Sequence, residues 1–109
     1  MSEGGALIWC PFPDAAAAEL AIMTLLDEGL IACGNIVPGV QSLFLWQGAR
    51  DRADECGTLV KTAALDLERA MARLETIHPY DTPAIMGWVV RTTEATERWL
   101  SGAASRCEE

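Results

Sequence analysis

The sequence predicts an α+β fold in which helices cover one face of an antiparallel sheet. Short apolar runs that suit strands alternate with segments whose apolar residues recur at helical spacing, and Pro and Gly separate them. The resulting order is strand, helix, strand, strand, helix, strand and a short last helix. A chain of 109 residues, half of them hydrophobic, has the length of one domain and the material for one core.

The first strand and helix have clear boundaries in the sequence. Residues 6–10 form an apolar run that contains Ile and Trp and ends at Pro11, which predicts a buried strand. Asp14 is positioned to cap the following helix, and Gly29 to end it. The apolar residues at helical spacing between them are Ala18, Ile22, Leu25 and Leu26.

A long strand is predicted over residues 31–48, with a bend at Pro38-Gly39. Residues 48–54 are polar and predict a turn, and the returning strand of the hairpin centres on Leu59-Val60. Gly57 either weakens that strand or marks a bulge. Beyond the bend, alternation places on one face Val40, Ser42, Phe44 and Trp46.

The second half of the chain continues with helix, strand and helix. Pro79 and Pro83 bracket a rigid connector, because each proline fixes its own φ and restricts the residue before it. The fourth strand covers residues 84–90, and Thr93 caps a short last helix. Residues 1–5 are expected to form a flexible lead, and residues 104–109 a tail. The two helical stripes consist of Leu67, Ala70, Met71, Leu74 and Ile77, and of Thr96, Trp99, Leu100 and Ala103.

This order of elements is the split β-α-β, ferredoxin-like pattern with one extra C-terminal helix. A sheet with one face in water alternates apolar and polar residues along its strands. The first and fourth predicted strands do not alternate, so something must cover their second face. Sister subunits of an oligomer are the simplest cover.

Composition argues against several classes of function. The net charge of -8 and the pI near 4.5 disfavour partners such as nucleic acids and anionic membranes, which attract Lys and Arg. No apolar run approaches the roughly 18 residues of a spanning helix, and no signal-peptide pattern is evident. The four cysteines, at positions 10, 33, 56 and 107, form no C-x-x-C pair, which favours a reduced cytoplasmic protein.

Cys10 and His78 are the first candidates for metal ligands, because a thiolate and an imidazole form a pair that suits copper-like ions. Pro79 restrains the chain directly after His78, and Asp81 adds a carboxylate nearby. Each candidate also has a structural interpretation. His78 can cap the preceding helix, Cys10 can be a small core residue, and Asp81 can accept hydrogen bonds in a turn. Two ligands are too few for a closed structural site, which usually has four.

A second set of candidates centres on Glu55 and Lys61, which lie six residues apart and share one face of their strand. With Trp46 and Tyr80, they either line a polar pocket between subunits or form an interface network. Cys33 either packs in the core of its strand or joins that pocket. No glycine-rich nucleotide motif and no G-x-S-x-G motif is present, so no enzymatic activity is expected.

Two segments resemble a known family. One runs from Ala32 through Pro38-Gly39 to Trp46 and Gly48, and the other is the stretch H-P-Y-D-T-P at residues 78–83. Together they resemble the CutA family over residues 6–101, with further matches at Cys10, Asp14, Glu55 and Lys61-Thr62. The resemblance implies a ferredoxin-like homotrimer with a role in tolerance of divalent cations.

The resemblance leaves two functions open. The first is weak binding of copper-like ions, with no obligatory cofactor, at Cys10, His78 and Asp81. The second is a PII-like signalling or scaffold module that holds a small effector between subunits, near Cys33, Trp46, Glu55, Lys61 and Tyr80. The chain departs from some relatives at Ile77, where they have a second His, and from most at Phe44, where Tyr is usual.

Overall fold

The computed structural model describes residues 2–108, with side chains for residues 3–102. Four strands form one antiparallel sheet in the order β2-β3-β1-β4, and the predicted α+β fold is confirmed. The strands are β1 (Ser2–Phe12), β2 (Cys33–Trp46), β3 (Ala49–Ala63) and β4 (Met86–Thr92). The helices are α1 (Ala15–Asp27), α2 (Leu67–Ile77) and α3 (Glu94–Glu108), with a short 3-10 turn, η1 (Ala64–Asp66), before α2.

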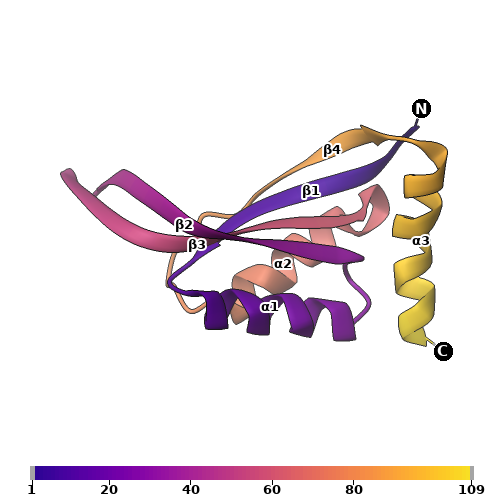
Figure 1. Cartoon of the computed structure of the whole chain (residues 1–109), viewed down its shortest axis with the longest axis horizontal. Coiled ribbons are helices and arrows are strands. Elements are labelled where there is room, and N and C mark those ends of the chain that lie inside the picture. The colour runs from indigo at the N-terminus through magenta and orange to yellow at the C-terminus, as the bar shows by residue number, and fades with distance from the viewer. Residues whose placement is uncertain (1, 109) are drawn as a thin grey trace.

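Helices α1 and α2 lie on one face of the sheet, and the core fills the space between them and the strands (Figure 1). Every second residue of β1 faces the helices, and its partners on β3 alternate in the same way. Buried residues of the two strands are Ala6, Ile8, Cys10 and Phe12 opposite Thr62, Val60, Thr58 and Cys56. Buried residues of the helices include Ala18, Leu25, Ala70 and Leu74.

The boundaries of α1 follow from local sequence, as predicted. Oδ1 of Asp14 accepts a hydrogen bond of 2.8 Å from the N–H of Ala17 at the N-terminus. At the other end, Gly29 has a φ of 70° and donates to the carbonyl of Leu26, while Leu30 donates to Leu25. These two bonds are the Schellman arrangement, which satisfies carbonyls that the helix leaves free.

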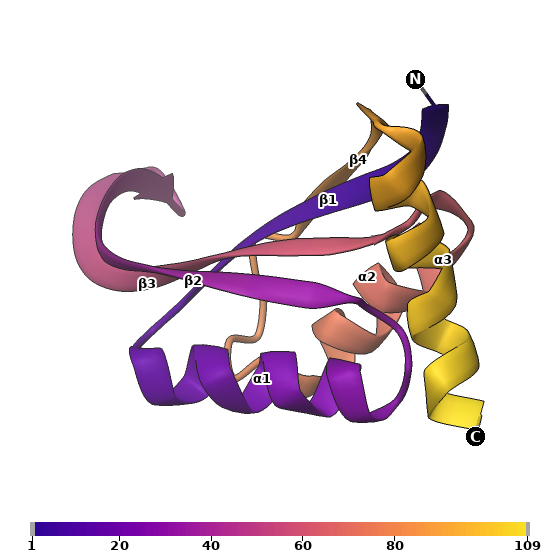
Figure 2. The same cartoon turned by 45° about the vertical axis from the view of Figure 1, so that its right-hand side comes forward.

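The β2–β3 hairpin extends beyond the helices as a curved arm (Figures 1 and 2). The predicted turn over residues 48–54 was wrong, because β3 already begins at Ala49. The turn consists of Gln47 and Gly48, whose φ values of 51° and 82° are both positive. This type I′-like geometry matches the twist of the flanking strands. The polar residues after the turn continue the strand because the arm lies in solvent and has no core to face.

The bend at Pro38-Gly39 is a bulge in β2. Val37 pairs with Gly57, and the next pair is Val40 with Glu55, so β2 holds one residue more than β3 between them. Gly57 itself stays in register and borders the bulge. Gly57 also makes room for Trp9, since a Cβ at this position would overlap the indole ring.

Both ends of the chain differ from the prediction. Strand β1 begins at Ser2, so residues 2–5 belong to the sheet and not to a flexible lead. Gly5 pairs with a strand on each side, with Ala63 on β3 and with Val90 on β4. Helix α3 reaches Glu108, so residues 104–108 are helical and not a tail. Residues 1 and 109 lie outside the described part, and β4 begins two residues later than predicted. Within residues 2–108, no helix is long and apolar enough to cross a membrane.

The sheet face opposite α1 and α2 is open over most of its length. Leu7 and Trp9 of β1 face this side, and their partners on β4 are Trp88 and Met86. Trp88 is 46% exposed and Met86 59% exposed. Helix α3 covers only the end near Gly5, where Leu100 packs and is 3% exposed. Cover by sister subunits stays a prediction.

Candidate functional site

The strongest concentration of the predicted residues lies where three segments meet: the end of β1, the connector over residues 78–85, and the hairpin arm. A largely apolar groove of about 470 Å³ runs between them. Three of the five predicted pocket residues line it, namely Trp46, Glu55 and Tyr80. The groove also includes Pro11, Ser42, Phe44, Leu45, Ala53, Thr82, Pro83 and Ala84.

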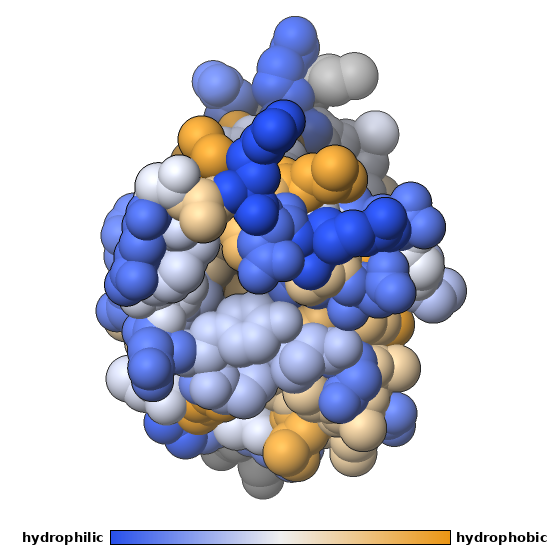
Figure 3. Space-filling view, turned by 90° about the vertical axis from the view of Figure 1, so that its left-hand side faces the viewer, coloured by the Kyte–Doolittle hydropathy of each residue, from blue (hydrophilic) through white to orange (hydrophobic). Residues whose placement is uncertain are grey.

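The molecular surface at the hairpin end mixes apolar and charged side chains (Figure 3). Leu43 and Leu45 are 79% and 72% exposed, and they pair with Arg52 and Arg50 on the neighbouring strand. Such exposed leucines on a projecting arm are typical of a surface that a partner covers.

His78 is buried, and both nitrogens of its ring are engaged. Nδ1 accepts a hydrogen bond of 3.1 Å from the N–H of Tyr80. Nε2 therefore carries the proton, and it donates to the carbonyl of Pro11 at 2.8 Å. The ring also stacks on Phe12, with a centroid distance of 4.3 Å. His78 is the C-cap residue of α2, as one interpretation of the sequence allowed, and its backbone N–H donates to the carbonyl of Leu74. Its ring instead bonds the connector and the first strand, at Tyr80 and Pro11.

Cys10 is fully buried on the helix side of β1, as the core interpretation of this residue predicted. Burial, and then the charge of Glu55, raise the pKa of the Cys10 thiol to about 12, so the sulfur stays protonated at neutral pH. Sγ lies 3.8 Å from the Pro11 carbonyl that also accepts from His78. The predicted thiol and imidazole thus converge on one backbone oxygen.

Tyr80 joins the connector to β3. Its hydroxyl donates to Oε2 of Glu55 at 2.9 Å. Burial, followed by this bond to Glu55, raises the pKa of Tyr80 to about 12. The ring lies 4.8 Å from the His78 ring, centroid to centroid. Glu55, Tyr80 and His78 therefore form one continuous set of contacts.

Asp81 is exposed and lines a shallow hollow beside Phe44 and Trp46. Among residues 3–102, whose side chains the structure describes, no group of three or more His, Cys, Asp or Glu is placed to hold a metal ion. The predicted trio of Cys10, His78 and Asp81 is therefore not assembled as a three-ligand centre within one chain.

Lys61 and Cys33 lie at the other end of the sheet, where they are direct partners across β2 and β3. Lys61 shares a face with Glu55, as predicted, but six residues of strand separate the two by about 20 Å. The five predicted pocket residues thus fall into two separate places in one chain. Lys61 lines a different cavity, beneath α3.

Two residues of the site, Pro11 and Phe12, were not predicted from the sequence. Pro11 supplies the carbonyl that binds His78, and Phe12 stacks on the same ring. Little in the sequence marks these two residues as neighbours of His78. Pro11 acts through its backbone carbonyl, which every residue has, and Phe12 lies 66 positions before His78.

The chain is similar to known proteins in both sequence and structure. Residues 6–103 match the family described as CutA1 divalent ion tolerance protein. The divalent-cation tolerance protein CutA of Pectobacterium atrosepticum is 34% identical over 80 residues, which are 73% of each chain. The structure of CutA from Xylella fastidiosa has a TM-score of 0.88 and 31% identity, covering 94% of this chain and 99% of that one. The periplasmic divalent cation tolerance protein CutA of Archaeoglobus fulgidus has a TM-score of 0.86 and 28% identity, covering 92% and 98%.

Proposed function

Because this chain belongs to the CutA1 divalent ion tolerance family, we propose that it serves in the response to divalent metal ions as a homotrimer that binds copper-like ions weakly. It acts by binding and not by catalytic turnover. Its free thiols at Cys10, Cys33 and Cys56 suit a reducing compartment, so the proposal places it in the cytoplasm.

The open face of the sheet supports the trimer. An antiparallel sheet that keeps one face in water carries polar residues there, yet β1 and β4 present Leu7, Trp9, Met86 and Trp88 on this face. Burial of such apolar surface is favourable by about 25 cal/mol per Å², which gives assembly a driving force. The exposed leucines of the hairpin arm add a second apolar surface for the same purpose.

The convergence of Cys10 and His78 on one carbonyl supports the metal-binding part of the proposal. Sulfur and imidazole nitrogen are donors that copper-like ions prefer. Binding requires the thiol to lose its proton and His78 to give up a hydrogen bond with Pro11 or Tyr80. Both requirements cost free energy, so the affinity for copper is expected to be low. The affinity should rise with pH, because the thiol must lose its proton before it binds the metal.

The test is a copper titration of reduced, metal-free protein by calorimetry. Saturable binding is expected, and the Cys10→Ser and His78→Ala variants should each lose at least the roughly tenfold in affinity that follows removal of a supporting partner. Cys33→Ser is the matched control, because this thiol lies at the far end of the sheet and should leave binding unchanged. Light scattering of each variant checks that the assembly survives.

Two results would overturn this site. The first is the absence of saturable copper binding by the parent protein. The second is equal affinity in the parent protein and in the Cys10 and His78 variants.

The groove beside Tyr80 favours a second candidate, a PII-like module that binds a small effector between subunits. Its volume of about 470 Å³ lies in the range of small-molecule sites, and Glu55 and Trp46 line it. A thermal-shift screen of small anions and nucleotides tests this role, since a ligand of the native state raises the melting temperature. Trp46→Ala should abolish a genuine shift. A shift of equal size in this variant would exclude the groove.

A further inference from the structure

Helix α1 is apolar on the side that faces away from the sheet as well as on the side that faces it. Leu20, Met23 and Leu26 lie on the outer side, where they are 69%, 53% and 41% exposed. A surface helix usually carries polar residues on its outer side, whereas a helix that is apolar all round is usually covered on both sides. The residues that the inner side of α1 contributes to the core are Ala18, Ala21, Ile22 and Leu25.

The three exposed residues form a continuous stripe, which we call the α1 stripe. Leu20 and Leu26 lie three residues before and after Met23, a spacing that makes side chains neighbours on a helix. Helix α1 lies along the margin of the molecule, with the sheet on its other side (Figure 1). The open sheet face is on the side of the sheet away from α1, so assembly through that face leaves the stripe exposed.

The charges that border the stripe are negative. Glu19 and Asp27 lie four residues before and after Met23, which places their carboxylates beside the stripe. The sequence of α1 contains no Lys or Arg. Arg73 of α2 reaches the end of α1, but its guanidinium pairs with Glu28 at 2.8 Å. The stripe is thus an apolar surface with an acidic border.

Charge decides between the possible occupants of the stripe. A second copy of the chain would bring the same carboxylates and a further net charge of -8 to the contact. An anionic membrane would be repelled in the same way. A partner with Lys or Arg beside its apolar residues would instead match both the stripe and its border.

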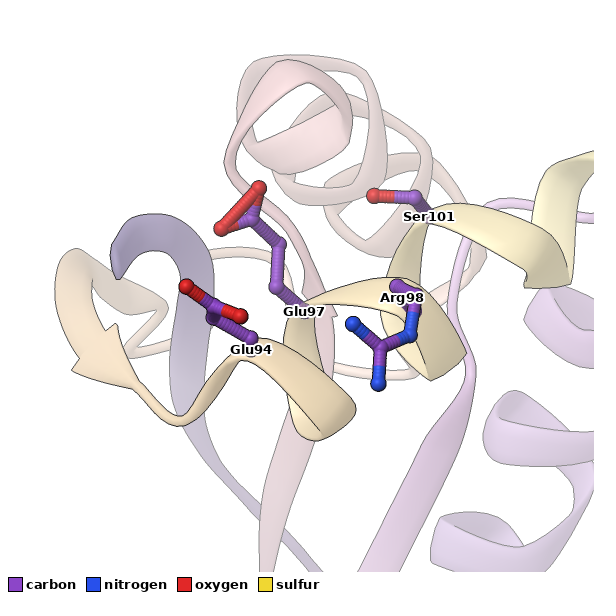
Figure 4. Close-up of a pocket in the computed structure, with 4 residues that line it drawn as sticks. All are labelled: Glu94, Glu97, Arg98 and Ser101. Atoms are coloured by element: carbon purple, nitrogen blue, oxygen red, sulfur yellow. The ribbon is translucent and has the colours of Figure 1, made fainter. Parts of the chain in front are cut away.

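A second acidic surface, along α3, lacks this combination. Glu94 and Glu97 line a hollow there together with Arg98 and Ser101 (Figure 4). All four of these residues are polar, and the guanidinium of Arg98 offsets part of the negative charge. This hollow offers no apolar contact, so it is a useful comparison surface.

We propose that the α1 stripe binds a basic amphipathic helix of a partner protein. The apolar side of that helix packs on the stripe, and its Lys or Arg side chains lie beside Glu19 and Asp27. Two helices pack well side by side because rows of side chains on one fit between rows on the other. Met23, at the centre, has a flexible side chain that adapts to its neighbours. The stripe spans only about 9 Å along the helix axis, so the contact is expected to be transient.

The experiment is a titration of the assembled protein into a fluorescent peptide of leucine and lysine, about 14 residues long, whose leucines lie on one helical face. As a helix this peptide is about 20 Å long, which matches α1. Salt at about 0.15 M screens the general attraction to an acidic protein. A saturable rise in anisotropy is expected, at least about tenfold tighter than for a peptide of the same composition with scattered leucines. Absence of saturable binding, or equal binding of the two peptides, would overturn the proposal.

Met23→Gln tests the apolar part of the contact. Glutamine is similar to methionine in length and in helix propensity, so the variant should keep its fold, which circular dichroism checks. Binding of the peptide should weaken about tenfold or more, because an apolar side chain is no longer buried. Leu65→Gln is the matched control, because Leu65 is 96% exposed on η1, outside the stripe. Equal affinity in the parent protein and in Met23→Gln would contradict the proposal.

Glu19→Gln tests the acidic border. Removal of one carboxylate should weaken binding by about two- to fivefold, and the difference should shrink at higher salt. Glu94→Gln removes the same charge from the hollow along α3 and should leave the affinity unchanged. The reverse pattern would assign the peptide to that hollow and exclude the stripe.

Two further measurements separate a protein partner from the other occupants. Light scattering should give the same mass for the parent protein and for Met23→Gln, and a lower mass for the variant would show that the stripe joins copies of this chain. Phosphatidylserine vesicles should not bind the parent protein, and binding that Met23→Gln abolishes would assign the stripe to a membrane. Either result would overturn the proposal. Copper binding should be the same in Met23→Gln and in the parent protein, because the stripe is independent of Cys10 and His78.

Discussion

At the scale of single residues, burial decides what each candidate side chain can do. Cys10 is fully buried, and its thiol keeps its proton far above the ordinary pKa of 9.0. His78 uses both ring nitrogens for bonds to the backbone. These side chains suit metal binding by type, but each must first give up an interaction of the folded protein. Residue type alone therefore overstates their availability.

The raised pKa of Cys10 predicts a loss of stability at alkaline pH. The unfolded thiol releases its proton near pH 9.0, while the folded thiol holds it to about 12. The unfolded state therefore binds fewer protons in this window, and the free energy of unfolding falls as pH rises through it. Cys10→Ala should flatten this decline in metal-free protein, measured by urea denaturation from neutral pH to about pH 10.

Cys33→Ala serves as the control for that experiment, since this thiol lies elsewhere on the sheet and should leave the decline unchanged. Cys10→Ala also removes packed atoms, which lowers stability equally at every pH. The slope against pH, and not the absolute stability, is therefore the quantity to compare. An unchanged slope in Cys10→Ala would show that the Cys10 thiol is not the cause of the decline.

At the scale of elements, the connector over residues 78–85 depends on a few contacts for its position. It has no strand partner of its own, and the bond from Tyr80 to Glu55 attaches it to β3. The base of the hairpin arm and the connector therefore form one unit around the groove. A change at either element is expected to alter the shape of the groove.

Tyr80→Phe should loosen this connector. Loss of the bond to Glu55 should cost about 1 kcal/mol of stability and speed amide hydrogen exchange in residues 79–85. Hydrogen exchange followed by mass spectrometry measures this, with the segments of α1 as the internal reference. Glu55→Gln retains an acceptor for the hydroxyl and should have a smaller effect. Unchanged exchange in Tyr80→Phe would show that the prolines and the contacts of His78 hold the connector without this bond.

At the scale of the whole molecule, the sheet has one filled face and one open face. The helix side buries a continuous core, while the open side presents tryptophan and methionine to solvent. The net charge of -8 makes separate molecules repel one another. Assembly must overcome this repulsion, so the apolar face is expected to pack closely against its partner. The subunit structure is thus expected to depend on few, well-packed residues.

Trp88→Glu should dissociate the proposed trimer. A carboxylate without a partner in an apolar interface should weaken association by roughly 3 kcal/mol, or about a hundredfold. Light scattering after size exclusion measures the mass, and circular dichroism checks the fold of the released subunit. Leu20→Glu is the matched control, because Leu20 is 69% exposed on α1, away from the open face. A trimer that survives Trp88→Glu would exclude the open face as the interface.

The sequence by itself determined the order of elements and the boundaries of α1 and α2, because these depend on neighbouring residues. Asp14 and Gly29 act within one turn of the helix that they bound, and the prolines at 79 and 83 restrict the chain locally. The same local reasoning failed at residues 48–54, where a polar stretch forms a strand because its partner is β2 and not a core.

Only the tertiary structure decided which candidate residues meet. The register of β1 on β3 and the path of the connector bring His78 to Pro11, and Tyr80 to Glu55. The same register puts Lys61 about 20 Å from Glu55 and beneath α3. The physical reason is that local preferences specify the conformation of each segment, whereas contacts between distant segments depend on how the whole core packs. The residue types in the site were therefore visible in the sequence, and their partners were not.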